Sequence, residues 1–155
     1  MIGEGAMKQS LQQKIANLGL VNVRLLPYQP REIMPQLIAY ADLHFIFMNR
    51  EMEKHGFPSK VYTIMACAKP LLISSGEDTP ITNFLQSINC AFIATETGFE
   101  EKCKKLIEFI KTGIDNPVSL ASMGQNGYNE VVENYSEYAV TSQYLTLVDS
   151  LLKDE

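Results

Sequence analysis

The sequence contains little cysteine, little histidine and no tryptophan. Its 155 residues include three cysteines and two histidines. Cys67, Cys90 and Cys103 are odd in number and widely spaced, and no CxxC or Cys/His ligand spacing occurs. This pattern excludes a disulfide framework and argues against a zinc site or any other metal centre. We therefore expect reduced thiols buried in a cytoplasmic protein.

Long apolar runs and an excess of basic residues are also missing. No run approaches the ~20 apolar residues that span a bilayer, so we expect no transmembrane segment. Residues 1–5 lack the basic and apolar regions of a signal peptide. The formal net charge of −5 argues against a nucleic-acid partner. The length and the hydrophobic content of 46% predict one domain over residues 1–155 with its own core.

What the sequence does contain is a regular alternation of helical and strand patterns. The run 43–48 is almost wholly apolar, which predicts a strand covered on both faces, and residues 49–55 are charged and predict an irregular loop. This alternation predicts an α/β fold, a Rossmann-like parallel sheet flanked by helices. Helices are expected over 6–18, 30–41, 58–67, 79–87, 99–112, 117–134 and 137–152, and strands over 22–26, 43–48, 70–74 and 91–94.

In such a sheet, ligands bind beyond the carboxyl ends of the strands. The run Gly56, Phe57, Pro58, Ser59 and Lys60 lies on such a loop and opens a helix. A helix N-terminus offers free amides and about half a positive charge, while glycine allows close approach of a ligand. A lysine in the first turn opposes the helix dipole, so a bound anion explains it better than helix stability does. The alternative is a plain helix start with a solvated lysine.

Four other positions have two readings each. Tyr28 and Gln29 either contact a nucleobase or form a surface patch on the neighbouring prolines. His55 is either a loop residue or a polar group at a reaction centre. Glu77 and Asp78 are adjacent, so their side chains diverge and suit a helix N-terminus better than a general acid/base pair. No Ser/His/Asp or Cys/His arrangement can be assembled.

Three stretches of the chain carry a family resemblance. Residues 2–48 contain a glycine turn, a helix, a short strand, a proline-flanked helix and an Ala-Asp strand start. Residues 56–74, GFPSKVYTIMACAKPLLIS, combine a Pro-Ser-Lys loop with a Lys-Pro strand start, and residues 123–136 read MGQNGYNEVVENYS. Together they resemble the C-terminal, nucleotide-sugar-binding half of GT-B glycosyltransferases of the family-4 type (group 1), particularly those of capsule and exopolysaccharide synthesis.

The resemblance implies a role for each candidate residue. The family transfers a sugar from a nucleotide-diphosphate donor, usually with retention and without a required metal or cofactor. Tyr28 and Gln29 would contact the base, and residues 56–60 would hold the diphosphate. The two glutamates of the family fall on His55, facing the transferred sugar, and on Thr63, facing the ribose; neither position is acidic here. Glu77 is counted with the donor-binding residues.

The resemblance also implies what the chain lacks and one local cost. Ala68 replaces the usual glycine before Lys69, and a left-handed backbone there would cost ~1 kcal/mol. The N-terminal acceptor domain of a GT-B enzyme and the first βα unit of the C-terminal domain are not in this sequence. We expect part of a hexosyltransferase that uses UDP- or GDP-sugars and a polysaccharide or lipid-linked acceptor. The isolated chain would be inactive, and it would act in the cytoplasm or at the inner membrane face through a partner.

Two readings compete with donor binding. A missing first strand would leave an exposed sheet edge, so the chain could instead be a non-catalytic interaction module that forms a homodimer by edge pairing. A non-hydrolysing sugar epimerase shares the fold, but it would need acidic and histidine groups that cannot be located here.

Overall fold

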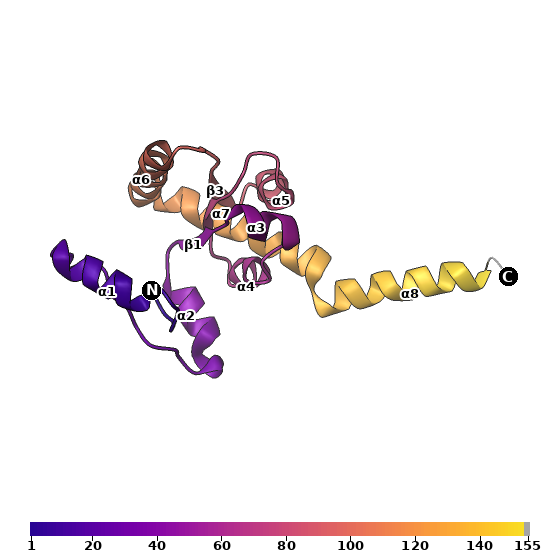
Figure 1. The fold of residues 1–155 in the computed structure, drawn as a ribbon. Coiled ribbons are helices and arrows are strands. Elements are labelled where there is room, and N and C mark those ends of the chain that lie inside the picture. Colours follow the sequence, from indigo (N-terminus) through magenta and orange to yellow (C-terminus); the bar gives the residue numbers. More distant parts are fainter. Residues whose placement is uncertain (154–155) are drawn as a thin grey trace. The chain divides into compact units, whose positions relative to one another are not determined.

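The computed structural model describes residues 1–153, except the side chains of His55 and Lys153 (Figure 1). Contacts divide the chain into two compact units, Met1–Leu37 and Ile38–Glu155. The boundary falls inside the helix α2, Met34–Tyr40. One domain over residues 1–155 therefore stays a prediction.

The first unit contains one helix and one parallel bridge. Ile2 pairs with Leu26, and the Gly3 amide donates to the Leu26 carbonyl at 3.0 Å. The helix α1, Lys8–Asn17, is as predicted, and Gly19 follows it with φ of 60°, the left-handed conformation of a C-terminal glycine. The predicted strand over 22–26 is wrong in extent, because pairing among the described residues is confined to Leu26. A 3₁₀ turn, Arg31–Ile33, leads into α2.

The second unit is built on a three-stranded parallel sheet in the order β1-β2-β3. The strands are β1, His44–Phe47; β2, Leu71–Ser74; and β3, Ala91–Ala94. Their register aligns His44 with Leu71 and Leu71 with Ala91. All four residues of β2 are buried, as expected for a central parallel strand. The predicted α/β parallel architecture is confirmed.

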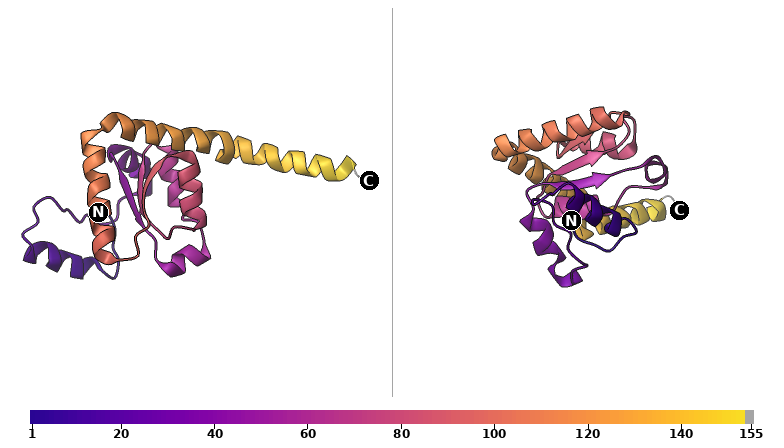
Figure 2. Two further views of the ribbon diagram at one scale, coloured as in Figure 1. Left: turned by 90° about the horizontal axis from the view of Figure 1, so that it is seen from above. Right: turned by 60° about the vertical axis from the view of Figure 1, so that its left-hand side comes forward.

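Helices cover both faces of this sheet. The crossover helices α4, Lys60–Ala66, and α5, Pro80–Ile88, connect successive parallel strands. Figure 2 shows α5 and α6, Phe99–Asp115, on opposite sides of the strands. The helix α7, Pro117–Glu130, packs on α4, and Gly124 in it approaches Ala68 so closely that a Cβ would lie 2.2 Å from the Ala68 carbonyl oxygen. The fully buried core includes Val61, Ile64, Met65, Leu71, Leu72, Ile73 and Leu85.

The strand β1 is not covered on both faces, contrary to expectation. Ile46 is 8% exposed and belongs to the core, whereas Phe45 and Phe47 are 40% and 62% exposed. Successive side chains of a strand point to opposite faces. The apolar run therefore forms a strand with one buried face, which includes Ile46, and one exposed aromatic face, which includes Phe45 and Phe47.

The charged run after β1 is a helix, not the predicted irregular loop. The helix α3 spans Arg50–His55. The Asn49 side chain accepts hydrogen bonds from the amides of Glu51 and Met52 at 3.1 and 2.8 Å. An N-cap asparagine followed by Arg, Glu, Met, Glu and Lys favours helix, and this local signal was missed because the charge pattern was interpreted as solvent exposure.

The C-terminal part leaves the body of the second unit. A π-helical turn, Val131–Tyr135, continues α7. The extended backbone of Ser136 ends this helical stretch before α8, Glu137–Lys153. The helix α8 extends away from the sheet (Figure 1). It exposes Tyr144, Leu145, Leu147, Val148, Leu151 and Leu152. Among residues 1–153, no helix combines the length and apolar character needed to cross a bilayer.

The expected strain at Ala68 is confirmed and is open to test. Ala68 has φ of 53°, a left-handed conformation that costs an L-residue about 1 kcal/mol. Ala68→Gly should raise the free energy of unfolding by about 1 kcal/mol in urea titrations. Ala66→Gly, at the exposed end of α4, should lower it by up to about 1 kcal/mol. A destabilised Ala68→Gly protein would contradict the account.

The thiol of Cys90 predicts an alkaline loss of stability. The side chain is 0% exposed, and burial raises its pKa to about 12 from 9.0. Because the folded pKa is the higher one, the contribution is fully present below pH 9 and is lost between about pH 9 and 12. The slope is at most about 1.4 kcal/mol per pH unit. Unfolding of Cys90→Ala between pH 8 and 11 should show a shallower decline than wild type; equal slopes would exclude this cause.

Candidate functional site

The carboxyl ends of the three strands define one edge of the sheet. Residues 48–59 follow β1, residues 75–79 follow β2, and residues 95–98 follow β3. Because parallel strands end on the same side, these three segments gather there. This is the edge at which open α/β sheets bind ligands.

A cavity of about 280 Å³ opens at this edge. Its lining comes from two segments: Glu53, Lys54, Gly56 and Phe57 after β1, and Pro80 and Ile81 at the start of α5. One wall therefore belongs to the segment between β1 and α4, and the other to the segment between β2 and α5. Of the predicted donor-binding residues, Gly56 and Phe57 line this cavity.

The loop between α3 and α4 is held by an aromatic anchor. The Phe57 ring lies 5.2 Å from the Tyr62 ring and 5.0 Å from the Phe84 ring, measured between centroids. Tyr62 also contacts Tyr135 at 4.8 Å. Burial, followed by the neighbouring Tyr135, raises the pKa of Tyr62 above its usual value. Gly56 has φ of 157°, which lets the backbone turn into this anchored position.

The start of α4 carries two of the predicted diphosphate-binding residues, Ser59 and Lys60. Ser59 is the N-cap, but its side chain accepts no hydrogen bond from the helix. The Val61 amide donates to the Pro58 carbonyl at 2.9 Å. Lys60 is exposed, forms no ion pair with a described side chain, and is not part of the lining of the cavity. Of the two lysines in this segment, Lys54 lies on the cavity.

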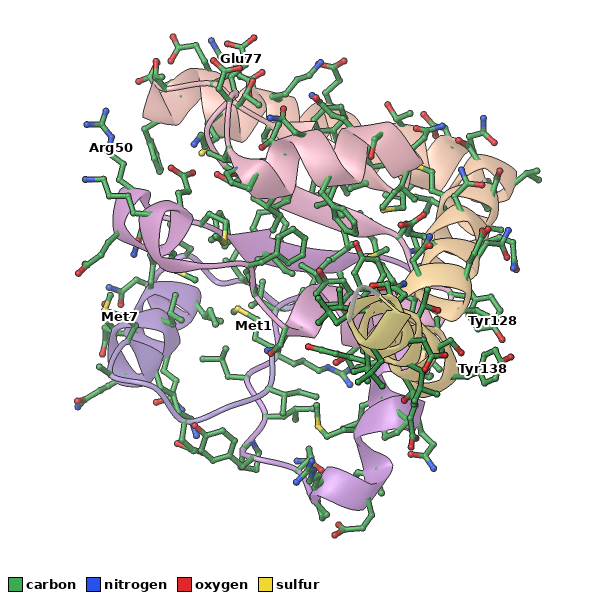
Figure 3. All side chains as sticks on the ribbon, turned by 90° about the vertical axis from the view of Figure 1, so that its right-hand side faces the viewer. Met1, Met7, Arg50, Glu77, Tyr128 and Tyr138 are labelled. Atoms are coloured by element: carbon green, nitrogen blue, oxygen red, sulfur yellow. The ribbon has the colours of Figure 1, made fainter. Side chains whose placement is uncertain are left out.

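The remaining predicted residues of this unit surround the cavity or lie apart from it. Pro58 is half-buried, and Thr63 is exposed on α4, where its amide approaches the Ser59 carbonyl at 3.5 Å. Glu77 is exposed in the loop before α5, and Figure 3 shows its side chain directed outward. His55 is the last residue of α3, but its side chain lies outside the described part of the chain.

Tyr28 and Gln29 belong to the first unit. Tyr28 is 71% exposed, and its hydroxyl donates to the Glu4 carbonyl at 3.2 Å. The Gln29 side-chain amide donates to the Pro27 carbonyl at 3.0 Å. Within that unit, the exposed Tyr28 ring is open to a partner. Its assignment to a nucleobase stays a prediction.

Two residues at the cavity were missed by the sequence analysis. Glu53 and Lys54 lie in the run that was interpreted as irregular. The Glu53 carboxylate accepts from the Ser75 hydroxyl at 3.0 Å and from the Gly76 amide at 2.6 Å. The Asn49 cap was the available signal: a helix starting at residue 50 carries residues 53 and 54 to the end of the strand instead of leaving them in a solvated loop.

A larger cavity lies at the opposite end of the strands. Its volume is about 620 Å³, and its lining includes Leu43, Ala68, Ile110, Ile114 and Leu120. Leu43 and Ala68 precede β1 and β2, so this cavity is at the amino ends of the strands. Its lining also includes the polar side chains of Asp42, Lys69 and Gln125. Because open α/β sheets bind ligands beyond the carboxyl ends of their strands, the smaller cavity remains the candidate site.

Comparisons with known proteins agree on the fold. Structural neighbours include HepE of Anabaena, solved with UDP-glucose (TM-score 0.72, 21% identity) and with UDP (0.71, 20%); each match covers 96% of this chain and 40% of HepE. Sucrose-phosphate synthase of Thermosynechococcus elongatus matches with a TM-score of 0.70 and 15% identity, over 97% of this chain and 36% of that enzyme. The chain thus spans about two-fifths of the length of these neighbours. A comparison with proteins of curated function finds no significant match.

The sequence itself assigns the family. Residues 1–130 match the family described as "Glycosyl transferases group 1", which is most of the chain and includes every segment that contributes to the carboxyl-edge cavity. The parallel α/β sheet and its GT-B neighbours are consistent with this match. The chain therefore belongs to the group 1 glycosyltransferases.

Proposed function

We propose that this chain is the donor-binding domain of a glycosyltransferase. It holds a nucleotide-diphosphate sugar of the UDP or GDP type, from which a hexosyl group passes to a polysaccharide or lipid-linked acceptor. The family match over residues 1–130 is the observation that carries this proposal. Support also comes from HepE, a structural neighbour solved with UDP-glucose. The cavity at the carboxyl edge, whose lining includes Lys54 and Gly56, offers a positive charge and an accessible backbone to the diphosphate.

The residues after β1 are proposed to bind the diphosphate of the donor. Gly56 and Phe57 line the cavity. In this proposal Ser59 and Lys60, which follow them at the start of α4 but are not part of the lining, supply a hydroxyl and a positive charge to the diphosphate. Lys54 adds a second cation at the cavity itself. These contacts are charge-assisted hydrogen bonds, the stronger class of such bonds.

The remaining roles follow the family pattern. Thr63 offers a hydroxyl to the ribose, Tyr28 and Gln29 contact the base, and His55 contacts the transferred sugar. Glu77 is counted with the donor-binding residues. A hydroxyl at position 63 binds a ribose more weakly than a carboxylate would. We therefore propose modest donor affinity.

Transfer itself needs a second domain. In a GT-B enzyme the acceptor lies across a cleft between two domains, and a donor site alone cannot align the reacting atoms. We propose that an N-terminal acceptor domain, on the same or a separate chain, completes the catalytic site. The reaction would then take place in the cytoplasm, or at the inner membrane face where a partner holds this domain.

Binding of UDP-glucose tests the proposal directly. Lys54→Ala and Lys60→Ala should each weaken binding roughly 10- to 100-fold, because a hydrogen bond to a charged group contributes about 1.5–3 kcal/mol. Isothermal titration of UDP-glucose and GDP-mannose into each variant measures this loss. Lys111→Ala removes an exposed lysine from α6 and should bind like wild type. The diphosphate assignment fails if Lys54→Ala and Lys60→Ala also both bind like wild type.

The open edge of β1 favours a second candidate function, an interaction module. His44 and Met48 donate to the β2 side, at Pro70 and Ser74, so the alternate residues Phe45 and Phe47 direct their backbone groups away from β2. Their rings, 3.9 Å apart between centroids, are exposed on one face. Antiparallel pairing of β1 with a second copy about a two-fold axis would satisfy these groups and join the rings.

Oligomeric state distinguishes this second candidate. Phe47→Lys should convert a concentration-dependent dimer to a monomer, because lysine at an edge opposes pairing. Phe99→Lys replaces an aromatic residue that is 82% exposed on α6 and should leave the dimer intact. Analytical ultracentrifugation from micromolar to millimolar protein supplies the measurement. A wild-type chain that stays monomeric throughout eliminates the interaction module.

A further inference from the structure

Glu53 bridges the two segments that form the cavity. It lies in α3, after β1, whereas Ser75 and Gly76 follow β2. One carboxylate oxygen, Oε1, accepts from the Ser75 hydroxyl at 3.0 Å and from the Gly76 backbone amide at 2.6 Å. In the described part of the chain, these hydrogen bonds connect residues 49–59 to residues 75–79. One carboxylate oxygen thus makes the hydrogen bonds between the two walls of the cavity.

The bonds continue into the start of α5. The Ser75 hydroxyl lies 2.9 Å from that of Thr79, the N-cap of α5, which accepts from the Thr82 amide at 3.2 Å. The Thr82 hydroxyl donates to the Gly76 carbonyl at 2.7 Å. Ser75 and Thr82 are 1% and 0% exposed, so water cannot replace these partners. The position of α5 therefore depends on the same set of bonds.

The negative charge of Glu53 gives this network its direction. An ionised carboxylate only accepts, and a hydroxyl carries a single proton. Once Ser75 donates to Glu53, it can only accept from Thr79. A carboxylate acceptor also makes the bond from the Gly76 amide charge-assisted, which strengthens it. Removal of Glu53 would leave the buried Ser75 and the Gly76 amide without this acceptor.

The helix α3 needs such a connection. With six residues, it is too short to be stable by local bonds alone. Asn49 holds its first turn, and Glu53 holds its last turn against residues 75–76. Lys54 and Gly56, which line the cavity, follow Glu53 directly. Their positions are therefore set by where Glu53 is held.

We infer that Glu53 is a positioning residue for the donor site: through Ser75 and Gly76 it fixes the segment Lys54–Phe57 against the start of α5. This inference rests on the proposed function for its ligand, because the segment it places is the one proposed to hold the diphosphate. Glu53 holds Ser75 and Gly76, which follow β2, and so places the backbone of the residues next to it. The carboxylate oxygen that makes these bonds does not contact the donor.

The test compares Glu53→Ala, Glu53→Gln and Glu51→Ala in the full chain. Glutamine keeps an oxygen that can accept both bonds, whereas alanine removes it. Glu51→Ala removes one negative charge from the same exposed helix, and the Glu51 side chain makes no hydrogen bond to the described residues, so this variant controls for charge and helix content. Ser75→Ala removes one donor and serves as a second probe, in which the bond from Gly76 to Glu53 can persist.

Two measurements are made on each variant. Amide hydrogen exchange by NMR should show Gly76 exchanging at least tenfold faster in Glu53→Ala, and within about twofold of wild type in Glu53→Gln and Glu51→Ala. Titration of UDP-glucose should show the dissociation constant raised at least fivefold in Glu53→Ala and restored in Glu53→Gln. A side chain that only stabilises the fold would lower the melting temperature without changing the affinity of the folded protein.

The outcomes separate this inference from the proposed function. Unchanged exchange at Gly76 in Glu53→Ala overturns the inference, as does equal affinity of Glu53→Ala and wild type for UDP-glucose. In the second case donor binding itself still stands. If wild type binds neither UDP-glucose nor GDP-mannose, the proposed function fails, and the exchange at Gly76 alone decides whether Glu53 holds the two segments together.

Discussion

The parallel pairing of β1, β2 and β3 is the constraint from which the rest of the second unit follows. Because the strands run in one direction, each connection must return across the sheet, and α4 and α5 make these crossovers. The same direction brings the segments after all three strands to one edge. Burial of β2 on both faces supplies the apolar contacts that hold this arrangement. The location of the candidate site therefore follows from the strand direction, and the side chains then determine its shape.

Two kinds of contact then shape that edge. The Phe57 ring is packed among Tyr62 and Phe84, which fixes one end of the loop by apolar burial. The carboxylate of Glu53 fixes the other end by hydrogen bonds to Ser75 and Gly76. Gly56 lies between these anchors in a backbone conformation that side chains rarely adopt. A small cavity lies beside this loop, although α3 and α4 are short helices.

The chain belongs to the group 1 glycosyltransferases, but it covers less than half of the structural neighbours it matches. The chain corresponds to about two-fifths of the length of HepE and of sucrose-phosphate synthase. Transfer requires an acceptor held in line with the donor, which donor binding does not. The exposed Phe45 and Phe47 of β1 and the apolar residues of α8 mark surfaces that this chain alone does not cover.

The sequence by itself determined the elements whose signals are local. Thr79 and Pro80 begin α5, Gly19 follows α1, and the apolar run 91–94 forms β3, because caps, turns and apolar runs act over a few residues. The family resemblance singled out Ala68 as a position where a left-handed backbone would be costly, and the structure has that backbone there. The tertiary structure decided what depends on neighbours distant in the sequence: which face of β1 is covered, and which lysine lies on the cavity. The bonding of Glu53 to residues 22 and 23 positions away belongs to the same class. The hydrophobic pattern indicates which side chains can be buried. Whether each one is buried depends on the elements that pack against it in the folded protein.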